Sequence, residues 1–448
     1  MKKLLTFLLA LTLTVPCMFS ACGDNDNGNI DGNGGNTENS GNTGGEDDGA
    51  QTPGDLPEWD ANRLLTVDEI LQTYPKSKLK CDEYSLNKYV TPYWTSQVIY
   101  NETVCFYEED GVVQAENLMY KPAKILEVRN YGLDKLYVEG EDYVMTENGI
   151  ALTENSTIPT TNFDFFYLDE PFDPNAAFKS IQYPDKYVAY NEFQYFTNKQ
   201  ICVTYIRTEE WSGPKQEYSS KLDNFVSKLE NKEDVTLLFY GDSIMEGCNA
   251  SDFRDNEPYM PRFSQLVSKK LSFYYGYADD TKITAYNTAV GGWLSSTGLQ
   301  NWNSKNGQIV PDLLVLNFGC NDGTHSAPAS DVVANMRAMI NKAKAANPDC
   351  AVILISPITP NKDATTSVSE ATVRNFYNEE HETYEAAYNE LAEEYEDVVC
   401  INMTTLYNWV LERKGFEDIM ASNISHPNDF FVRFYAQTIL TKLIKDYQ

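Results

Sequence analysis

The pattern of hydrophobic and polar positions divides the chain into two regions with different periods. In residues 56–215, short apolar and aromatic runs are separated by Pro, Asn, Asp and Gly, which is typical of strands joined by turns. The runs lie at 103–107, 112–113, 125–128, 136–138, 163–167 and 201–206. Asp110–Gly111, between two of the runs, supplies the positive φ values that a tight hairpin needs. The pattern predicts a β-sandwich domain over residues 56–215.

From residue 221 onward, short apolar strands alternate with amphipathic helices. We expect strands at 235–240, 283–287, 313–318, 351–355 and 398–401. We expect helices around 262–271, 330–346, 370–396, 406–413 and 430–447. Strands that alternate with helices fold by right-handed crossovers into a parallel sheet covered by helices, and ligands bind beyond the carboxyl ends of its strands. The sequence therefore predicts an α/β domain over residues 221–448, with its site at that edge.

The first residues have the features of an export signal. Two lysines precede an apolar run, Leu4–Val15, which is too short to span a bilayer as a mature helix. The run is followed by Phe19-Ser20-Ala21-Cys22, and small residues before a cysteine at this distance resemble a bacterial lipobox. We expect residues 1–21 to be a lipoprotein signal peptide and Cys22 to carry the lipid. An ordinary signal peptide with an incidental cysteine is the alternative.

Residues 22–55 differ in composition from the rest of the chain. After Cys22 they are rich in Gly, Asn and acidic residues and contain no Lys or Arg. Such a segment cannot bury enough apolar surface to fold, so it predicts a disordered tether. A lipidated Cys22 before a tether indicates an exported lipoprotein of a Gram-negative outer membrane, on its periplasmic face or at the cell surface.

The net charge of the chain argues against one class of binding partner, nucleic acids. Lys and Arg total 35 against 66 Asp and Glu, which gives a net charge of −31 and a pI near 4.4. A nucleic-acid partner is therefore not expected, because the cations that would neutralise phosphates are lacking. Hydrophobic residues make up 42% of the chain and aromatic residues 13%, which excludes wholesale disorder.

The cysteines do not indicate a metal site or a disulfide framework. Of nine cysteines, Cys17 would leave with the signal and Cys22 would be lipidated, so an odd number remains. The remaining cysteines are widely scattered, with no Cys-x-x-Cys motif and no Cys/His cluster. We expect most of them to be buried as small hydrophobes.

Polar residues follow three of the predicted strands at the edge where ligands bind. Gly241-Asp242-Ser243 comes after the first strand, Gly291-Gly292 after the second, and Asn321 after the third. A serine here could be a nucleophile, and the Asn321 amide could donate to a developing oxyanion. Each motif alone is also an ordinary turn, in which Asp242 or Ser243 merely caps a helix.

Few residues could act as a general base near neutral pH, because the chain has only three histidines. His381 lies among Glu379, Glu380 and Glu382, which suggests a solvated helix face. His325 follows Asn321 by four residues and could contact the substrate. His426 lies in a loop before the last predicted helix, again at the edge of the sheet, and is the best candidate for the base.

Taken together, these motifs resemble those of the SGNH, or GDSL-type, hydrolase family. Gly241-Asp242-Ser243 resembles the nucleophile block, and Asn287 with Gly291 or Gly292 resembles the glycine block. The remaining blocks are Gly319-Cys320-Asn321-Asp322 and His426-Pro427. The resemblance covers residues 235–448 and implies a three-layer, flavodoxin-like parallel sheet. The N-terminal region more loosely resembles the β-domain that precedes some carbohydrate esterases.

The resemblance also implies a role for each motif residue. Ser243 would attack an ester carbonyl while His426 accepts its proton, and water would then hydrolyse the acyl-enzyme. The backbone N–H groups of Ser243 and Gly291, with the Asn321 amide, would form the oxyanion hole. Gly291 is chosen over Gly292 because it comes first after the strand. No metal and no cofactor is implied.

One position departs from the family pattern. The family has Asp three residues before the histidine, and this chain has Asn423. Three interpretations remain open: a Ser–His dyad oriented by a backbone carbonyl, a carboxylate from elsewhere in the chain, or an impaired enzyme. Asp429 could assist His426 but is expected to cap the last helix. Asp242, Asn423, Asp429 and His325 are thus possible orienting residues or substrate contacts.

The expected substrate follows from family analogy and from the expected location. We expect an esterase that removes acyl groups, above all O-acetyl groups, from polysaccharides or oligosaccharides. Its partners would be an acylated glycan and, through the lipid anchor, a membrane, with the oligomeric state left open. A lipase or thioesterase is the alternative from the same chemistry. A catalytically impaired glycan-binding lipoprotein is the alternative from another class.

Overall fold

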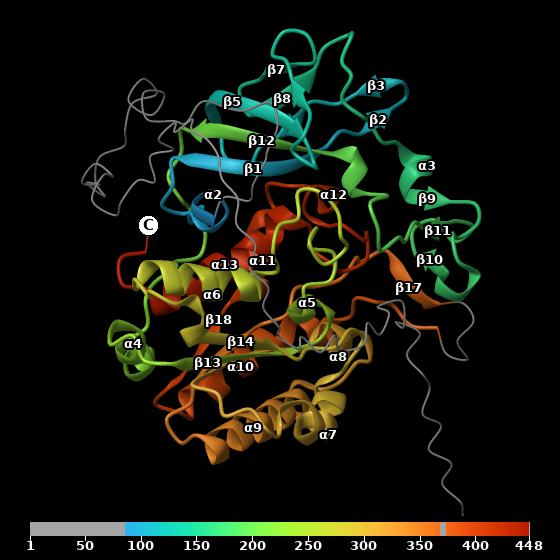
Figure 1. Ribbon diagram of the computed structural model, residues 1–448. Helices are drawn as coiled ribbons and strands as arrows, with labels where there is room; N and C mark the ends of the chain where they lie inside the picture. The colour runs from blue at the N-terminus through green and yellow to red at the C-terminus, as the bar shows by residue number, and fades with distance from the viewer. Residues whose placement is uncertain (1–85, 368–372, 448) are drawn as a thin grey trace, which may run out of the picture.

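The computed structural model describes residues 86–367 and 373–447 (Figure 1). The expected signal peptide, the tether, Cys22 and Cys81 lie outside the described residues. Six described cysteines are free thiols, and all except Cys400 are buried, as expected. None of the described helices combines the length and the apolar character needed to cross a membrane.

The C-terminal half is built on a parallel sheet of five strands. Its spatial order is β14 (Ile283–Asn287), β13 (Val235–Gly241), β15 (Leu313–Asn317), β16 (Ala351–Ile355) and β18 (Val398–Ile401). This order, in which the first strand lies between the second and the third, is that of flavodoxin-like folds. The predicted three-layer parallel fold and all five predicted strands are confirmed.

Helices cover both faces of this sheet because alternate strand residues point to opposite sides. Leu238, Leu314 and Val352 pack with the helices of one face, and Leu237, Val315 and Ile353 with those of the other. The first face carries α7 (Ser295–Asn306), α9 (Ala329–Ala346) and α10 (Tyr384–Glu393). The second face carries α6 (Phe263–Tyr274), α11 (Met403–Leu411) and α13 (Asp429–Leu443). Shorter helices are α4 (Asp223–Glu230), α5 (Ser243–Glu246), α8 (Cys320–Thr324), α12 (Phe416–Ile419) and the 3₁₀ turns η3 (Ser220–Leu222), η4 (Asp280–Lys282) and η5 (Glu379–Thr383).

The N-terminal region is rich in strands, as predicted, and contains several sheets. The largest is antiparallel, in the order β1 (Val98–Cys105), β12 (Gln200–Arg207), β5 (Pro122–Asn130) and β6 (Leu136–Tyr137). A second contains β4 (Glu116–Asn117), β8 (Gly149–Leu152) and β7 (Tyr143–Met145), and a third β2 (Glu108–Glu109) and β3 (Val112–Val113). The predicted hairpin turn at Asp110–Gly111 joins β2 and β3, with both residues at positive φ. Helices here are α2 (Leu86–Val90), α3 (Phe163–Phe166), η1 (Pro174–Ala176) and η2 (Thr197–Lys199).

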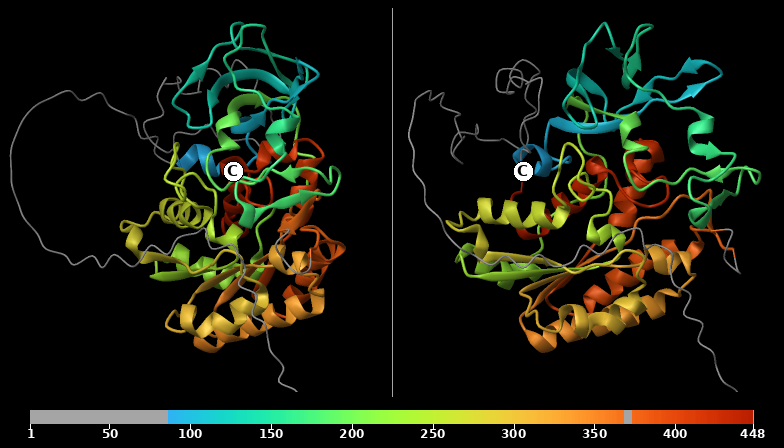
Figure 2. Two further views of the ribbon diagram at one scale, coloured as in Figure 1. Left: turned by 90° about the vertical axis from the view of Figure 1, so that its right-hand side faces the viewer. Right: turned by 45° about the vertical axis from the view of Figure 1, so that its right-hand side comes forward.

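The two halves of the chain share a sheet and a core. A fourth sheet has the order β17 (Ala364–Ser367), β10 (Phe178–Ser180), β11 (Tyr187–Val188) and β9 (Tyr167–Leu168), so a C-terminal strand pairs with N-terminal ones. The β1–β12–β5 sheet lies over α13 and α6, which in turn cover the parallel sheet (Figures 1 and 2). One hydrophobic cluster accordingly contains residues of both halves, such as Tyr93 and Phe434, whose ring centroids lie 4.5 Å apart.

Two local predictions are wrong. Phe163–Phe166 is a short helix rather than a strand, because the Asn162 side chain accepts a hydrogen bond from Phe165 N and caps it. The helix expected at 370–396 begins only in the η5–α10 segment, where Asn378 caps η5, and a strand, β17, ends just before the undescribed residues 368–372. Helices α4 and α7 were not predicted.

A buried ion cluster fixes the β1–β12–β5 sheet against the C-terminal half. The Lys414 Nζ lies 3.1 Å from Glu102 Oε1 on β1 and 3.2 Å from Asp418 Oδ2, and the Lys414 and Glu102 side chains are fully buried. Asp418 also accepts a hydrogen bond from Cys105 N at 2.7 Å. Burial alone would lower the pKa of Lys414, but the charges of Asp418 and Glu102 raise it to about 12. The lysine is therefore charged, with both partners within ion-pair distance.

Lys414→Met should destabilise the protein strongly. It removes the cation but leaves Glu102 and Asp418 buried, which costs about 3–5 kcal/mol of unfolding free energy for a pair broken in this way. Urea unfolding followed by circular dichroism measures the loss. The control is Lys215→Met, because the Lys215 side chain is 80% exposed and should contribute little. Equal unfolding midpoints for the two variants would show that the cluster does not hold the halves together.

Candidate active site

Ser243 is the first residue of α5, immediately after β13, at the carboxyl edge of the parallel sheet. β13 and β15 can approach closely here because Gly241 has no side chain: a Cβ at this position would clash with Asn317 O on β15. The Ser243 N–H is among the first in its helix, which have no intrahelical acceptor. Hydroxyl and N–H therefore both lie at the edge where the sequence predicts a site.

Asp242 caps α5, the helix that begins at Ser243, and is not among the residues that line the site cavity. Its Oδ1 accepts a hydrogen bond from Ile244 N at 3.0 Å, and its side chain is buried. Burial raises the pKa of this carboxyl to about 7. The hypothesis that Asp242 orients the histidine or contacts substrate is thus replaced by a capping role, which the sequence also allowed.

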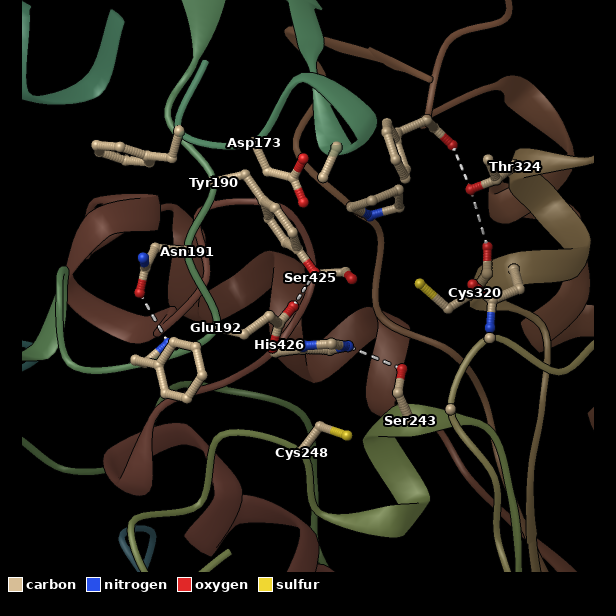
Figure 3. Close-up of a pocket in the computed structure, with 18 of the residues that line it drawn as sticks. Asp173, Tyr190, Asn191, Glu192, Ser243, Cys248, Cys320, Thr324, Ser425 and His426 are labelled. Atoms are coloured by element: carbon tan, nitrogen blue, oxygen red, sulfur yellow. Dashed lines mark hydrogen bonds and ion pairs between the residues drawn. The ribbon is translucent and has the colours of Figure 1, made fainter. Parts of the chain in front are cut away.

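His426 approaches Ser243 from a tight turn before α13. The Ser422 Oγ accepts a hydrogen bond from His426 N at 3.1 Å, and His426 O accepts one from Ala421 N at 2.9 Å. The turn directs the ring at α5, where His426 Nε2 lies 2.8 Å from Ser243 Oγ (Figure 3). The two residues that the sequence predicted as nucleophile and base are therefore within hydrogen-bond distance.

The carboxylate beside His426 comes from the other half of the chain. Glu192 Oε2 lies 2.9 Å from His426 Nδ1 (Figure 3). Glu192 follows β11, and its position, 234 residues before the histidine, explains why the local motifs gave no sign of it. Of the three interpretations of Asn423, a carboxylate from elsewhere in the chain agrees with this contact.

The surroundings of Glu192 keep it ionised. Burial alone would raise its pKa, but His426, Tyr190 and Arg254 lower it to about 2. The Arg254 Nη2 lies 2.7 Å from Glu192 Oε2, and the Tyr190 hydroxyl donates to Glu192 Oε1. The group that faces His426 Nδ1 is thus a buried carboxylate with two further partners.

Asn423 and Asp429 do not orient His426. The Asn423 Nδ2 donates to Ala189 O at 3.1 Å, in the segment that leads to Glu192. Asp429 Oδ1 accepts a hydrogen bond from Ser251 N at 2.9 Å, and burial raises the pKa of this carboxyl to about 6. Asp429 is also not the helix cap, because the Asn428 side chain accepts from Phe431 N and caps α13.

The groups predicted as oxyanion donors differ in the hydrogen bonds that they make. Asn321, in α8, lines the same cavity as Ser243 and donates from Nδ2 to Trp293 O at 3.2 Å. An amide nitrogen carries two N–H groups, so a second remains on the same atom. The structure does not favour Gly291, because its N–H donates to Glu246 Oε2 at 2.8 Å. Gly292, at φ +75° on the cavity wall, is the alternative that the sequence left open.

The other two histidines support the fold rather than line the cavity. His325 Nδ1 lies 2.9 Å from Asn321 O and Nε2 lies 2.8 Å from Arg374 Nη2, so the structure does not support His325 as a substrate contact. His381 is fully buried, which contradicts the expected solvated face, and burial lowers its pKa. Its Nε2 lies 2.9 Å from Cys320 O at the start of α8, and thereby steadies the turn that carries Asn321.

Both halves of the chain form the cavity at Ser243. Its volume is about 580 Å³. The C-terminal half supplies Ser243, His426, Asn321 and both glycines, and the segment 172–193 supplies the opposite wall. That wall is polar and aromatic and contains Phe172, Asp173, Asn175, Ala176, Tyr190, Asn191, Glu192 and Phe193. Figure 3 labels four of them: Asp173, Tyr190, Asn191 and Glu192. Within the part of the chain that the structure describes, no group of three or more His, Cys, Asp or Glu side chains could hold a metal ion.

The chain was compared with solved structures and with curated proteins. An acetylxylan esterase from Geobacillus stearothermophilus, a catalytic mutant, is 16% identical over 48% of this chain and 96% of its own, with a TM-score of 0.38. A psychrotrophic esterase from Pseudoalteromonas is 15% identical over 46% and 95%, with a TM-score of 0.33. A two-domain esterase active on acetylated mannans is 16% identical over 49% and 52%, with a TM-score of 0.36. No curated protein matches the chain.

A comparison with family models covers the residues that carry the site. The model of the GDSL-like lipase/acylhydrolase family matches residues 239–430, which include Ser243, Asn321 and His426. The match begins in β13, before Ser243, and ends at the start of α13, after His426. Residues 239–430 therefore belong to the GDSL-like lipase/acylhydrolase family.

Proposed function

We propose that the protein is a serine ester hydrolase in which Ser243 is the nucleophile and His426 the general base. The observation that carries the proposal is the 2.8 Å distance between Ser243 Oγ and His426 Nε2 at the wall of an open cavity. The Ser243 oxygen would attack the ester carbonyl as its proton passes to Nε2. His426 would then protonate the leaving alkoxide, and water would hydrolyse the acyl-enzyme by the same route.

Charge that develops on the carbonyl oxygen needs donors at fixed positions. Three groups around the cavity meet this need: the Ser243 N–H at the start of α5, the free N–H of the Asn321 amide, and the Gly292 N–H. Asn321 is held by Trp293 O and by the α8 turn that His381 supports. Donors that are already oriented require no reorganisation during the reaction.

We propose O-acetylated oligosaccharides or polysaccharides as the substrate class. The cavity wall formed by segment 172–193 combines side chains able to bind hydroxyl groups, Asp173, Asn175 and Asn191, with exposed aromatic rings. Phe172 and Phe193 are 51% and 63% exposed, so each presents a ring face or edge to solvent. A sugar offers hydroxyl groups and an apolar ring face, which such a wall complements, whereas a long acyl chain would favour an all-apolar groove.

Ser243→Ala should abolish ester hydrolysis and leave the fold intact, because only the attacking oxygen is lost. Release of acetate from an aryl acetate and from a panel of acetylated oligosaccharides measures the activity. Ser304→Ala, an exposed serine on α7, is the matched control and should behave as wild type. Turnover by Ser243→Ala at the wild-type rate would end the nucleophile assignment, and a wild-type chain that released no acyl group from any ester would favour an impaired, glycan-binding protein.

Asn321→Ala should lower kcat about 10²–10³-fold, the usual cost of one oxyanion donor. The substitution also removes the hydrogen bond to Trp293 O, so circular dichroism and thermal unfolding should accompany the kinetics. Asn303→Ala, on the exposed side of α7, controls for loss of an asparagine. A kcat within about threefold of wild type would remove Asn321 from the oxyanion hole.

Phe172→Ala should raise KM for acetylated oligosaccharides about 3–10-fold, since a ring contact contributes about 0.5–1.5 kcal/mol beyond its buried area. KM for a small aryl acetate, which does not extend along the wall, should change less. Phe273→Ala is the control, because Phe273 is 52% exposed on α6 and does not line the cavity. Equal changes for both substrates would show that segment 172–193 does not bind sugar.

A further inference from the structure

We propose that Glu192, supplied by the N-terminal half of the chain, is the residue that positions His426, and that Asn423 anchors the segment that carries it. This proposal rests on the proposed function for its chemical meaning. It makes the N-terminal half a part of the catalytic centre rather than an appended binding domain. The first argument is the contact itself, 2.9 Å between Glu192 Oε2 and His426 Nδ1.

This contact selects the form of the imidazole that catalysis needs. A carboxylate can only accept, so Nδ1 must carry the hydrogen, and Nε2 is left with a lone pair directed at Ser243 Oγ. When the Ser243 proton passes to Nε2, the imidazolium that forms lies beside a negative charge. Glu192 itself takes up no proton in this step. It acts through His426 and is a positioning residue.

Glu192 is held firmly enough for this task. Its side chain is 8% exposed and has three polar partners: His426, Arg254 and Tyr190. Arg254 is itself fixed, because its Nε and Nη2 lie 3.1 and 3.0 Å from Asn249 Oδ1. A carboxylate with several fixed donors has little freedom to turn away from the histidine.

Asn423 stands where the family has its orienting Asp. The contacts of Asn423 explain why this chain has an amide there and not a carboxylate. The Asn423 Nδ2 donates to Ala189 O at 3.1 Å, three residues before Glu192. An Asp at this position would face a carbonyl oxygen with no hydrogen to donate. Asn361 Nδ2 in turn donates to Asn423 O at 2.9 Å, which steadies the left-handed backbone of Asn423, at φ +61°. The amide thus ties the turn of His426 to the segment of Glu192.

The other charged groups near His426 have hydrogen-bond partners of their own. Asp242 is bound to Ile244 N, Asp429 to Ser251 N, and Asp173 to Asn175 N. Arg254 pairs with Glu192, and the hydroxyl of Tyr190 donates to the same carboxylate. Cys248 and Cys320 line the cavity, and burial raises the pKa of the Cys320 thiol, which keeps it neutral. Among the described residues, His426 forms an ion pair with Glu192.

The test compares Glu192→Gln with Glu170→Gln, an exposed carboxylate of the same N-terminal half. The full-length chain is labelled at histidine, and its three histidine signals are followed by NMR as pH changes, with His426→Ala to assign the third. Loss of the carboxylate should move the midpoint of the His426 titration down by about 1–3 pH units, because the imidazolium loses its partner. Unchanged His325 and His381 signals show that the fold is intact.

Kinetics give the second measurement on the same variants. Glu192→Gln should lower kcat on the order of 10³–10⁴-fold, as loss of the orienting carboxylate does in serine proteases. The acidic limb of the kcat/KM profile should move to lower pH together with the NMR midpoint. Glu192→Asp, which keeps the charge, should recover part of the loss. Glu170→Gln should match wild type in both measurements.

The role of Asn423 is tested by a double-mutant cycle. If Asn423 acts through Glu192, Asn423→Ala should lower kcat in the wild-type background but cause little further loss in Glu192→Gln. Fully additive losses would overturn the anchoring role. An unmoved His426 midpoint in Glu192→Gln would overturn the positioning role, whatever the activity. If the wild-type chain hydrolyses no ester, yet Glu192→Gln lowers the His426 midpoint relative to wild type, the proposed function is overturned and the positioning role stands.

Discussion

The enclosure of α13 between two sheets is the constraint on which the rest of the structure depends. All of its fifteen residues except Lys442 are buried, so this helix has no solvent face in the folded chain. One side packs with α6 against the parallel sheet, and the other receives β1 and the rings of Tyr93 and neighbouring aromatic residues. A C-terminal half without the β1–β12–β5 sheet would expose this apolar surface to water. The hydrophobic effect therefore holds the two halves together.

Polar contacts at the same boundary decide how the halves are placed. Apolar packing is not directional, but the Arg433 guanidinium donates to Tyr100 O and Asn101 O at 2.8 and 2.7 Å. The Asn428 amide, at the cap of α13, donates to Thr103 Oγ1 and Gln200 Oε1, both at 3.0 Å. Buried donors left unpaired would cost free energy, so one relative position is favoured. The start of α13 lies three residues after His426, so this placement reaches the site directly.

The parallel sheet could be predicted from the sequence because each of its strands is marked by a local pattern of residues. β13, β15 and β16 are short apolar runs buried on both faces, and the motifs of Ser243 and Asn321 follow the ends of β13 and β15, which places them at one edge. The errors arise where local patterns are ambiguous. An apolar run such as Phe163–Phe166 fits a helix or a strand, and the Asn162 cap decides for the helix. His381 lies among glutamates in sequence, yet its ring is buried against Cys320.

Glu192 was beyond reach of the sequence for a different reason. Nothing in its neighbours distinguishes it from the other acidic residues of an acidic chain, and its contact with His426 spans 234 positions. The one available sign was Asn423, which stands where the family has an Asp. Its presence indicates that another carboxylate must orient His426, but not which residue supplies it. A carboxylate of the N-terminal half can reach His426 only because α13 and its polar cap fix the position of that half closely enough for a hydrogen bond to form. If the two halves were less firmly packed, Glu192 would not be held beside His426. An Asp in the turn that carries His426 would then orient the histidine more reliably.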